Sequence, residues 1–328
     1  MSKTRFSIII PFYNSEDFIK ETILSVLDNK YDDFEIILID DGSTDLSYDI
    51  CNEFVDLHSN IIILRQENQG PNVARNKGLI EANGDYVLFI DADDLLESNC
   101  LDKLDSIIQS SHIDYVCYGI NFFDNITNER LNVKKMHPKL YSSDDIVKEA
   151  FTSNSFLGVC WNKCISLKFI KEHSISFQPD KMHGRDILFS RTCAVNANNV
   201  KVIDDVFCHS RYHNGSFSRR FKISNIHSAI DLADKHISKF NCIVERKLLN
   251  SAIKKHFNYI LLLSSFRAES YIEFKKHFKL IKDKESKIFE DNRIHHSLYS
   301  LVLAMYLSTP IVSWSLSKIL SKFGYKPY

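Results

Sequence analysis

Residues 85–94 read Asp-Tyr-Val-Leu-Phe-Ile-Asp-Ala-Asp-Asp, an apolar run that ends in a cluster of carboxylates. The run predicts a buried strand, and Asp91, Asp93 and Asp94 lie at its C-terminal end, where open α/β sheets bind ligands. Carboxylates this close repel one another unless a cation lies among them, and such oxygen ligands suit Mg²⁺ or Mn²⁺ bridging to phosphate. The segment therefore predicts a site for a metal and a phosphorylated substrate. The alternative is a solvated acidic turn in which Asp94 caps a helix that begins near Leu95.

The first 120 residues alternate apolar runs of strand length with amphipathic stretches of helical spacing. This alternation predicts an α/β fold with a mostly parallel sheet and helices on its faces. Strands are expected at residues 7–10, 35–39, 61–64, 86–90 and 115–120. Helices are expected to start near Ser15, Thr44, Asn72 and Glu97, each at or close to a residue suited to a helix N-terminus.

Two later regions differ in character from this alternation. Residues 121–142 are polar and rich in Asn without clear periodicity, which predicts a loop that leaves the sheet. From Phe221 onward, apolar residues recur at helical spacing among Lys-rich stretches, and the next glycine is Gly324. We therefore expect an α/β domain over residues 1–220 and a smaller helical region over residues 221–328.

Composition and the N-terminal sequence limit which binding partners and which cellular compartment are expected. The formal net charge of -1 gives no overall attraction to nucleic acid, so no nucleic-acid partner is expected. The N-terminus carries no apolar signal-peptide region, which predicts a cytoplasmic protein. Eight cysteines without a Cys-x-x-Cys pair predict reduced, mostly buried thiols. Cys160 and Cys164 alone do not predict a zinc site.

Two further polar segments follow predicted strands at the same edge of the sheet as the acidic cluster. Pro11-Phe12-Tyr13-Asn14 follows the first strand, and Asp40-Asp41-Gly42-Ser43 follows the second. A nucleoside could be held there, because a carboxylate can accept a hydrogen bond from a base N–H and Tyr13 can stack on the ring. Gly42 allows close approach of the backbone. The start of the next helix presents Arg75 and Lys77, one of which could reach the base or the phosphates.

In this order and spacing the segments resemble family 2 glycosyltransferases of the GT-A fold, which are inverting enzymes that use nucleotide-sugar donors. The resemblance rests on the Pro-x-Tyr-Asn start, the Asp-Asp-Gly-Ser-Thr-Asp turn, the Ala-Arg-Asn helix and the Asp-Ala-Asp-Asp strand end, and it covers residues 5–218. It implies that Asp93 binds the metal, with Asp91 in the ribose or metal region. It also implies a set of donor-binding residues, namely Pro11, Tyr13, Asn14, Asp40 or Asp41, and Arg75.

The same resemblance extends to the acceptor side. Trp161-Asn162-Lys163 resembles the family's Trp-x-Lys segment, and Trp161 could offer an apolar face to a sugar ring or could simply be a core residue. Asp186 matches the family's catalytic base at the start of a helix, although a plain helix cap is the alternative. Arg185 stands where the family usually has Glu. A guanidinium that pointed at Asp186 would lower the pKa of this carboxyl and weaken it as a base.

The last matching segment, residues 211–218, resembles the family's C-terminal loop that closes over the diphosphate. The resemblance implies that Arg211 pairs with phosphate and that His213 donates to phosphate or binds the metal through a neutral nitrogen. A solvated basic turn is the alternative interpretation.

Taken together, the resemblance implies transfer of a sugar from a UDP-sugar donor to an oligosaccharide or lipid-linked saccharide, with Mn²⁺ or Mg²⁺ as cofactor. Bacterial capsule, O-antigen or another surface polysaccharide is the expected product. The alternatives are a nucleotidyltransferase and a non-catalytic nucleotide-sugar binding module, but the sequence contains no Walker-type loop and no Gly-x-Gly-x-x-Gly.

The apolar stretch at residues 301–314 is too short to span a bilayer and contains Pro310. Two interpretations are open. The stretch packs on the catalytic domain or on another subunit of a homo-oligomer, or it anchors the enzyme peripherally at the inner face of the membrane with help from Lys318, Lys322 and Lys326.

Overall fold

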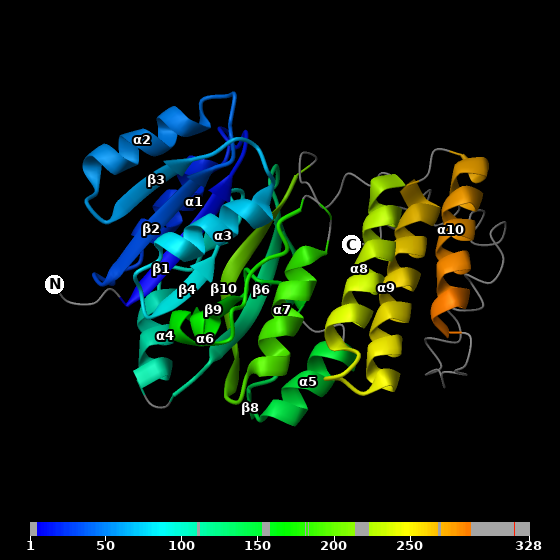
Figure 1. Cartoon of the computed structure of the whole chain (residues 1–328). Helices are drawn as coiled ribbons and strands as arrows, with labels where there is room; N and C mark the ends of the chain where they lie inside the picture. The colour runs from blue at the N-terminus through cyan, green and yellow to red at the C-terminus, as the bar shows by residue number, and fades with distance from the viewer. Residues whose placement is uncertain are drawn as a thin grey trace. The chain divides into compact units, whose positions relative to one another are not determined.

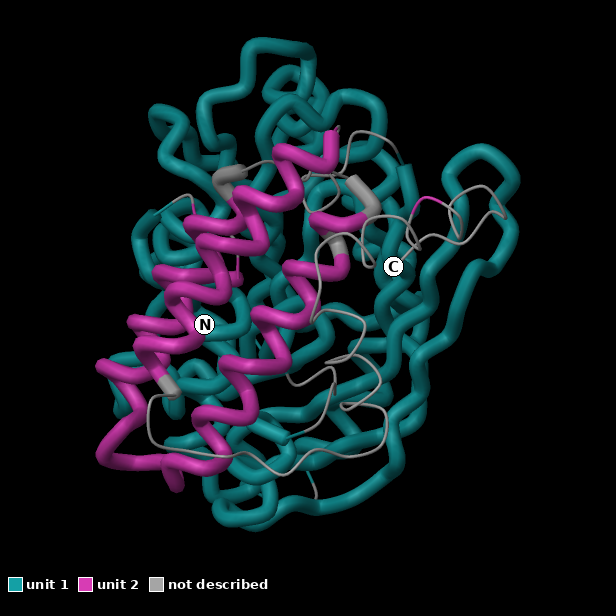
Figure 2. The backbone as a smooth tube through the Cα atoms, turned by 90° about the vertical axis from the view of Figure 1, so that its right-hand side faces the viewer, with its two compact units in different colours: residues 1–181, 185–214 teal, residues 182–184, 215–328 magenta. Residues whose placement is uncertain are grey.

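The structure is a computed structural model that describes residues 5–109, 112–152, 158–180, 182, 184–213, 223–267, 270–289 and 318. The chain separates into two compact units (Figure 2). The sheet unit comprises residues 1–181 and 185–214, and the helical unit comprises residues 182–184 and 215–328. The functional assignment of residues 1–220 to catalysis and 221–328 to packing, oligomerisation or membrane association stays a prediction. The apolar stretch at residues 301–314 lies outside the described residues.

The described strands form one ten-stranded sheet in the sheet unit. They are β1 Phe6–Phe12, β2 Phe34–Asp40, β3 Ile61–Arg65, β4 Tyr86–Phe89, β5 Leu95–Leu96, β6 Tyr115–Asp124, β7 Arg130–Lys134, β8 Lys139–Tyr141, β9 Lys163–Ser166 and β10 Val200–Tyr212. The order is β3-β2-β1-β4-β9-β6-β10-β5, with β7 paired to β6 and β8 paired to β10. The first four strands of this order are parallel, β9 lies antiparallel between β4 and β6, and β10 runs parallel to β6.

The helices of the sheet unit cover both faces of this sheet (Figure 1). They are α1 Ile19–Leu27, α2 Ser47–Leu57, α3 Pro71–Glu81, α4 Cys100–Gln109, α5 Ser143–Thr152, α6 Leu167–Glu172 and α7 Arg185–Asn196. Every residue of β1 and β4 is buried, as parallel strands covered on both faces require. The expected α/β fold with a mostly parallel central sheet is confirmed.

The predicted helix starts differ from the observed ones by at most four residues. α1 and α2 begin three to four residues later than expected because a turn precedes each of them, and Ser15 O already accepts hydrogen bonds from the amides of Phe18 and Ile19. α3 begins at Pro71, in the first-turn position that suits proline. The loops that precede these helices follow the carboxyl ends of β1, β2 and β3, and they therefore lie at the edge of the sheet.

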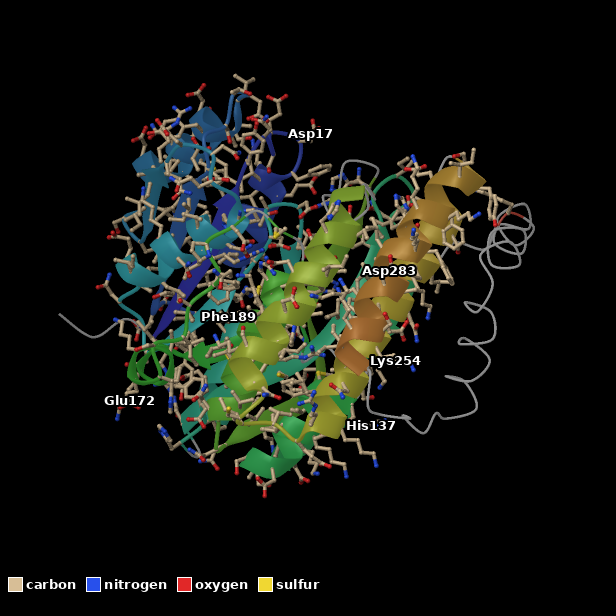
Figure 3. All side chains as sticks on the ribbon, turned by 45° about the vertical axis from the view of Figure 1, so that its right-hand side comes forward. Asp17, His137, Glu172, Phe189, Lys254 and Asp283 are labelled. Atoms are coloured by element: carbon tan, nitrogen blue, oxygen red, sulfur yellow. The ribbon has the colours of Figure 1, made fainter. Side chains whose placement is uncertain are left out.

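Aromatic side chains fill the space between the sheet and α7. Phe189, labelled in Figure 3, stacks on Phe177 with ring centroids 3.9 Å apart. Both rings meet Phe89 of β4 edge-on, at 5.8 and 5.1 Å. Because β4 leads directly into the acidic cluster and α7 begins next to Asp186, this packing fixes two expected parts of the site against one core.

The prediction of a loop over residues 121–142 is wrong in part. β6 continues to Asp124, and β7 and β8 add strands to the sheet within that segment. The residues of β7, Arg-Leu-Asn-Val-Lys, alternate between polar and apolar, but the run is only five residues long and its side chains are mostly exposed. No buried face therefore marks it as a strand. Backbone pairing with a neighbouring strand, which is invisible in the sequence, makes β7 a strand.

The helical unit contains α8 Ile223–Phe240, α9 Arg246–Arg267 and α10 Tyr271–Phe289, which pack on one another. Their mutual core includes Phe240, Phe257 and Phe274. Ion pairs connect Lys254 with Glu285 and Lys284 with Asp234 across the helices; Lys254 is labelled in Figure 3. None of the described helices combines the length and the apolar character needed to cross a membrane.

The expectation for the cysteines is confirmed. All eight are free thiols, of which seven are buried and Cys242 is exposed. Burial raises the pKa of the Cys160 thiol to about 12, so this thiol stays protonated at neutral pH.

Candidate functional site

The carboxyl ends of β1, β2 and β4 meet at one edge of the sheet. β1 is parallel to both neighbours, with Phe12 opposite Asp40 and Ile9 opposite Phe89. The segments that follow these strands therefore leave the sheet together. The structure thus brings the Tyr13, Asp41 and Asp91 segments to one edge, as sequence order alone suggested.

Asn14 connects the first two segments. Its backbone φ is +47°, and its Oδ1 accepts a 2.8 Å hydrogen bond from the amide of Thr44. Its own amide donates to Ser43 Oγ at 3.1 Å. Next to this link, Tyr13 is 48% exposed, whereas Pro11 is buried within β1. Tyr13 is therefore free to stack on a planar group, and Asn14 holds the two loops at a fixed spacing.

Asp40 and Asp41 are buried and already engaged in the loops around them. Asp40 accepts from the Ser43 amide at 2.8 Å and pairs with Arg65 at 2.9 Å. Asp41 accepts from three groups, which are Gln66 Nε2 at 2.8 Å, the Gln69 amide at 2.8 Å and the Gly70 amide at 2.7 Å. Such bonds satisfy a buried carboxylate. Asp41 thereby fixes the turn that enters α3.

Arg75 of α3 and Asp91 form a close pair. Arg75 Nη2 lies 2.6 Å from Asp91 Oδ1, and its Nη1 donates to Asn72 Oδ1 at 3.3 Å. The guanidinium lies over the Phe177 ring at 5.5 Å and is almost fully buried. Burial opposes its charge, but Cys160, Asp91 and Asp186 together raise the pKa of Arg75. Asp91 therefore has its cation within the protein.

Asp94 is the most buried member of the acidic cluster. Its Oδ1 accepts from the backbone amide of Arg211 at 3.0 Å. Burial, followed by the nearby Asp93 and Asp91, raises the pKa of Asp94 well above its ordinary value. It does not cap a helix at Leu95, because β5 occupies that position and α4 begins at Cys100. Asp94 thus connects the acidic turn to β10.

Asp93 faces His213 at the end of β10. His213 Nε2 lies 2.8 Å from Asp93 Oδ2, and the His213 ring packs on Phe18 with centroids 4.5 Å apart. A carboxylate oxygen and an imidazole nitrogen are both ligands that Mn²⁺ accepts, so this donor set fits the expected cation. Within the described residues, no group of three or more His, Cys, Asp or Glu side chains stands together as a complete metal site.

Asp186 lies in the first turn of α7 and is partly buried. Burial raises the pKa of its carboxyl, Asp91 adds to this effect, and Arg75 and the amides at the helix start oppose it. Arg185 Nε donates instead to Asp180 Oδ1 at 2.8 Å. The largest influence on the Asp186 pKa is burial, which raises it, and the largest opposing influence is Arg75.

Trp161 packs partly against the core. Its ring meets Phe122 edge-on at 6.5 Å, and its carbonyl accepts a hydrogen bond from Tyr118. Asn162 Nδ2 donates to the Tyr118 carbonyl at 3.1 Å, and Lys163 Nζ donates to the Val159 carbonyl. These bonds fix the turn on which Trp161 lies, with part of its ring accessible.

A family model described as Glycosyl transferase family 2 matches residues 7–171, just over half of the chain. The chain belongs to glycosyl transferase family 2. It is 31% identical over 236 residues to the cholesterol galactosyltransferase of Borreliella burgdorferi, covering 67% of this chain and 64% of that protein. It is 29% identical over 205 residues to the poly(ribitol-phosphate) beta-glucosyltransferase of Bacillus spizizenii, covering 61% and 31%.

Among solved structures, the crystal structure of S. aureus TarS 1-349 in complex with UDP-GlcNAc superimposes with a TM-score of 0.73 at 19% identity. The superposition covers 99% of this chain and 93% of that one, which shows that the fold is shared. The chain spans less than two thirds of the length of the two curated relatives named above. Because it belongs to glycosyl transferase family 2, the chain is an enzyme, a glycosyltransferase.

Three residues that contact the candidate site had no recognisable signal in the sequence. Glu21 of α1 and Asn125 after β6 both bond to the Arg211 guanidinium, and Phe18 contacts both Arg211 and His213. Glu21 and Arg211 are 190 positions apart, so no local pattern connects them.

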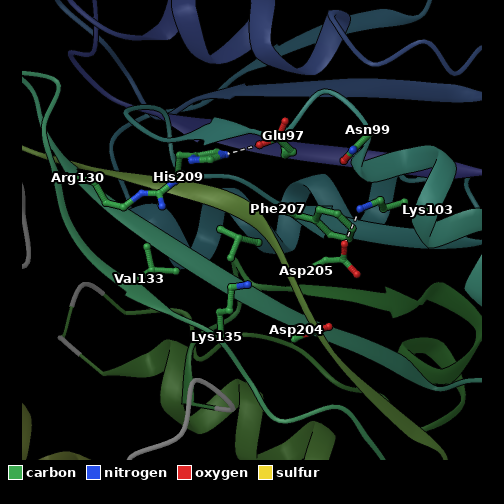
Figure 4. Close-up of a pocket in the computed structure, with 11 residues that line it drawn as sticks. Glu97, Asn99, Lys103, Arg130, Val133, Lys135, Asp204, Asp205, Phe207 and His209 are labelled. Carbon is green, nitrogen blue, oxygen red and sulfur yellow. Dashed lines mark hydrogen bonds and ion pairs between the residues drawn. The ribbon is translucent and has the colours of Figure 1, made fainter.

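A cavity of about 400 Å³ lies elsewhere in the sheet unit, between α4, β7 and β10 (Figure 4). Its lining includes Lys103, Asp205, His209 and Glu97. Lys103 pairs with Asp205 at 2.5 Å and His209 with Glu97 at 3.0 Å, as Figure 4 marks. None of the residues expected in the active site lines this cavity.

Proposed function

We propose that this glycosyltransferase moves a sugar from a UDP-sugar donor to a hydroxyl of a saccharide acceptor, with inversion at the anomeric carbon. The expected product is a bacterial surface polysaccharide. The observation that carries the proposal is the Asp93–His213 pair at the sheet edge, with Asp186 held at the start of α7. The names of the relatives support it, since one is a beta-glucosyltransferase acting on poly(ribitol-phosphate) and TarS was crystallised with UDP-GlcNAc.

Asp93 and His213 would hold a divalent cation, Mn²⁺ or Mg²⁺. When bound, such a cation supplies positive charge against the negative charge that grows on the leaving diphosphate. Mg²⁺ and similar ions commonly use one or two protein carboxylates and take further ligands from substrate phosphates and water. Asp91 is paired with Arg75, so we propose that Asp91 contributes near the ribose rather than as the main ligand.

The uridine would lie along the loops after β1 and β2. Tyr13 is the exposed aromatic residue there and would stack on the base. Asn14, Asp40 and Asp41 would act mainly by holding these loops in place, since their side chains are already bonded within them.

Asp186 would remove the proton from the acceptor hydroxyl as the hydroxyl oxygen attacks the anomeric carbon. The bond from that carbon to the diphosphate breaks on the opposite face, so no covalent enzyme intermediate forms. The raised pKa of Asp186 suits this role, because the conjugate acid must hold the proton after transfer. Trp161 would offer an apolar surface to the acceptor sugar. Peripheral membrane contact and a homo-oligomer remain predictions for the C-terminal region, together with a cytoplasmic location.

A panel of nucleotide sugars tests the proposal. The protein is incubated with Mn²⁺ and UDP-glucose, UDP-galactose, UDP-GlcNAc or UDP-GalNAc, and release of UDP is measured. Release of GDP from GDP-mannose is measured for comparison. We expect slow hydrolysis of at least one UDP-sugar and none by the Asp93→Asn variant. Equal rates for both proteins on every donor would refute a UDP-sugar site at this edge.

A further inference from the structure

Arg211 is buried, although it opens the segment expected to close over a diphosphate. Its Nε donates to the Asp93 carbonyl at 3.0 Å, its Nη1 to Asn125 Oδ1 at 2.7 Å and its Nη2 to Glu21 Oε2 at 2.6 Å. The residue is 6% exposed, and the guanidinium lies between the rings of Phe18 and Phe123 at 5.2 and 5.1 Å. Each nitrogen of the fork therefore has a partner inside the sheet unit.

The backbone of Arg211 adds a fourth connection to the same turn. Its amide donates to Asp94 Oδ1 at 3.0 Å, next to the side-chain bond to the Asp93 carbonyl. Arg211 thus holds the main chain of Asp93 and the side chain of Asp94. The carboxylate of Asp93 faces His213, which lies two residues after Arg211 in the chain. One arginine consequently sets where that carboxylate points.

Moving the guanidinium to a phosphate would break these bonds. Glu21 would lose its cation, and the Asp93 carbonyl would lose the donor that fixes the turn. The rigid planar fork of arginine matches three fixed acceptors, a geometry that lysine cannot reproduce. A buried charge with all its bonds made is stable, whereas a buried charge without them is costly.

We infer that Arg211 is a positioning residue, which orients the Asp93 carboxylate for cation binding by holding its carbonyl, and that it does not contact the diphosphate. This inference rests on the proposed function, because it takes Asp93 as the cation ligand. Groups that hold a metal ligand in place typically affect metal affinity by about 10- to 100-fold when they are removed.

The two roles make opposite predictions for UDP binding without metal. A guanidinium that contacts the diphosphate strengthens UDP binding in EDTA as well as in Mn²⁺. A guanidinium that only positions Asp93 matters when the cation is present. The dissociation constant of UDP is therefore measured calorimetrically in EDTA and in Mn²⁺ for each variant.

For Arg211→Met we expect the UDP affinity in EDTA to be unchanged. The increase in UDP affinity that Mn²⁺ brings should be about 10- to 100-fold smaller than in the wild type. Asp93→Asn should show the same pattern. Glu21→Gln, a change on the half-exposed side of the pair, should show a smaller loss in Mn²⁺ only. Arg130→Met, at an exposed arginine of β7, is the matched control and should bind like the wild type in both buffers.

Weaker binding of UDP by Arg211→Met in EDTA would overturn the inference. So would tighter binding by Glu21→Gln, because a released guanidinium would then be reaching the phosphates. Glu21→Gln keeps the test valid if Arg211→Met does not fold. A wild-type protein that shows no Mn²⁺-dependent UDP binding would instead refute the proposed function itself, which separates the two failures.

Discussion

Arg75 Nη2 lies 2.6 Å from Asp91 Oδ1, so an arginine of α3 neutralises the first carboxylate of the acidic strand end. The three neighbouring carboxylates are thus stabilised in three different ways. Asp91 has Arg75, Asp94 has a raised pKa and a backbone donor, and Asp93 faces His213. We therefore propose Asp93 as the principal carboxylate that meets a cation from solution.

Asp93→Asn should nearly abolish transfer, because an amide replaces the carboxylate that we propose as the cation ligand. The test compares initial rates at saturating Mn²⁺ with those of Asp56→Asn, an exposed aspartate on α2, as the control. Full activity of the Asp93 variant, or of the wild type in excess chelator, would contradict the metal assignment.

Asp186→Asn should lower turnover by about 10²- to 10⁴-fold, the usual contribution of a general base. UDP affinity should stay unchanged, since no donor contact is assigned to this residue. Turnover is followed at saturating donor, and UDP binding is measured separately. A collapse of UDP binding with surviving turnover would place Asp186 in the donor site instead.

The raised pKa of Asp186 also predicts how stability depends on pH. The folded protein binds the Asp186 proton more tightly than the unfolded chain does. The stabilisation that this proton gives to the folded state is therefore fully present below the ordinary carboxyl pKa. That contribution is lost as pH rises through the raised pKa. Asp186→Asn should therefore be more stable than the wild type at pH 7, with a difference that disappears near pH ~3.9. Melting temperatures across this range provide the measurement, and a variant less stable at pH 7 would count against the raised pKa.

Gly42→Ala should weaken UDP binding and destabilise the protein by about 1–3 kcal/mol. Gly42 has a φ of +79°, and an added Cβ would lie 2.9 Å from the Asn68 amide nitrogen. The turn that Asp41 holds would have to move. Denaturant unfolding and UDP titration check this, with Ser59→Ala at an exposed position as the control. Wild-type values for both quantities would show that the turn tolerates the side chain.

The sequence by itself determined the α/β alternation, the strands that carry the site and the edge at which their loops meet. Apolar runs longer than three residues and their order along the chain suffice for this, because parallel strands must present their carboxyl ends together. The sequence also pointed to Asp93 and His213, and the structure places them 2.8 Å apart.

Only the tertiary structure decided what each charged residue contacts. Arg75 and Arg211 were expected to contact the nucleotide or its phosphates, and the orientation of Arg185 was left open. In the structure these arginines pair with Asp91, Glu21 and Asp180, respectively. β9 is inserted between β4 and β6, and β7 is a short strand whose side chains are mostly exposed. The physical reason is the same in each case. Side-chain partners and strand neighbours are set by which distant segments pack together, and a buried charge takes the partner that this packing brings within reach.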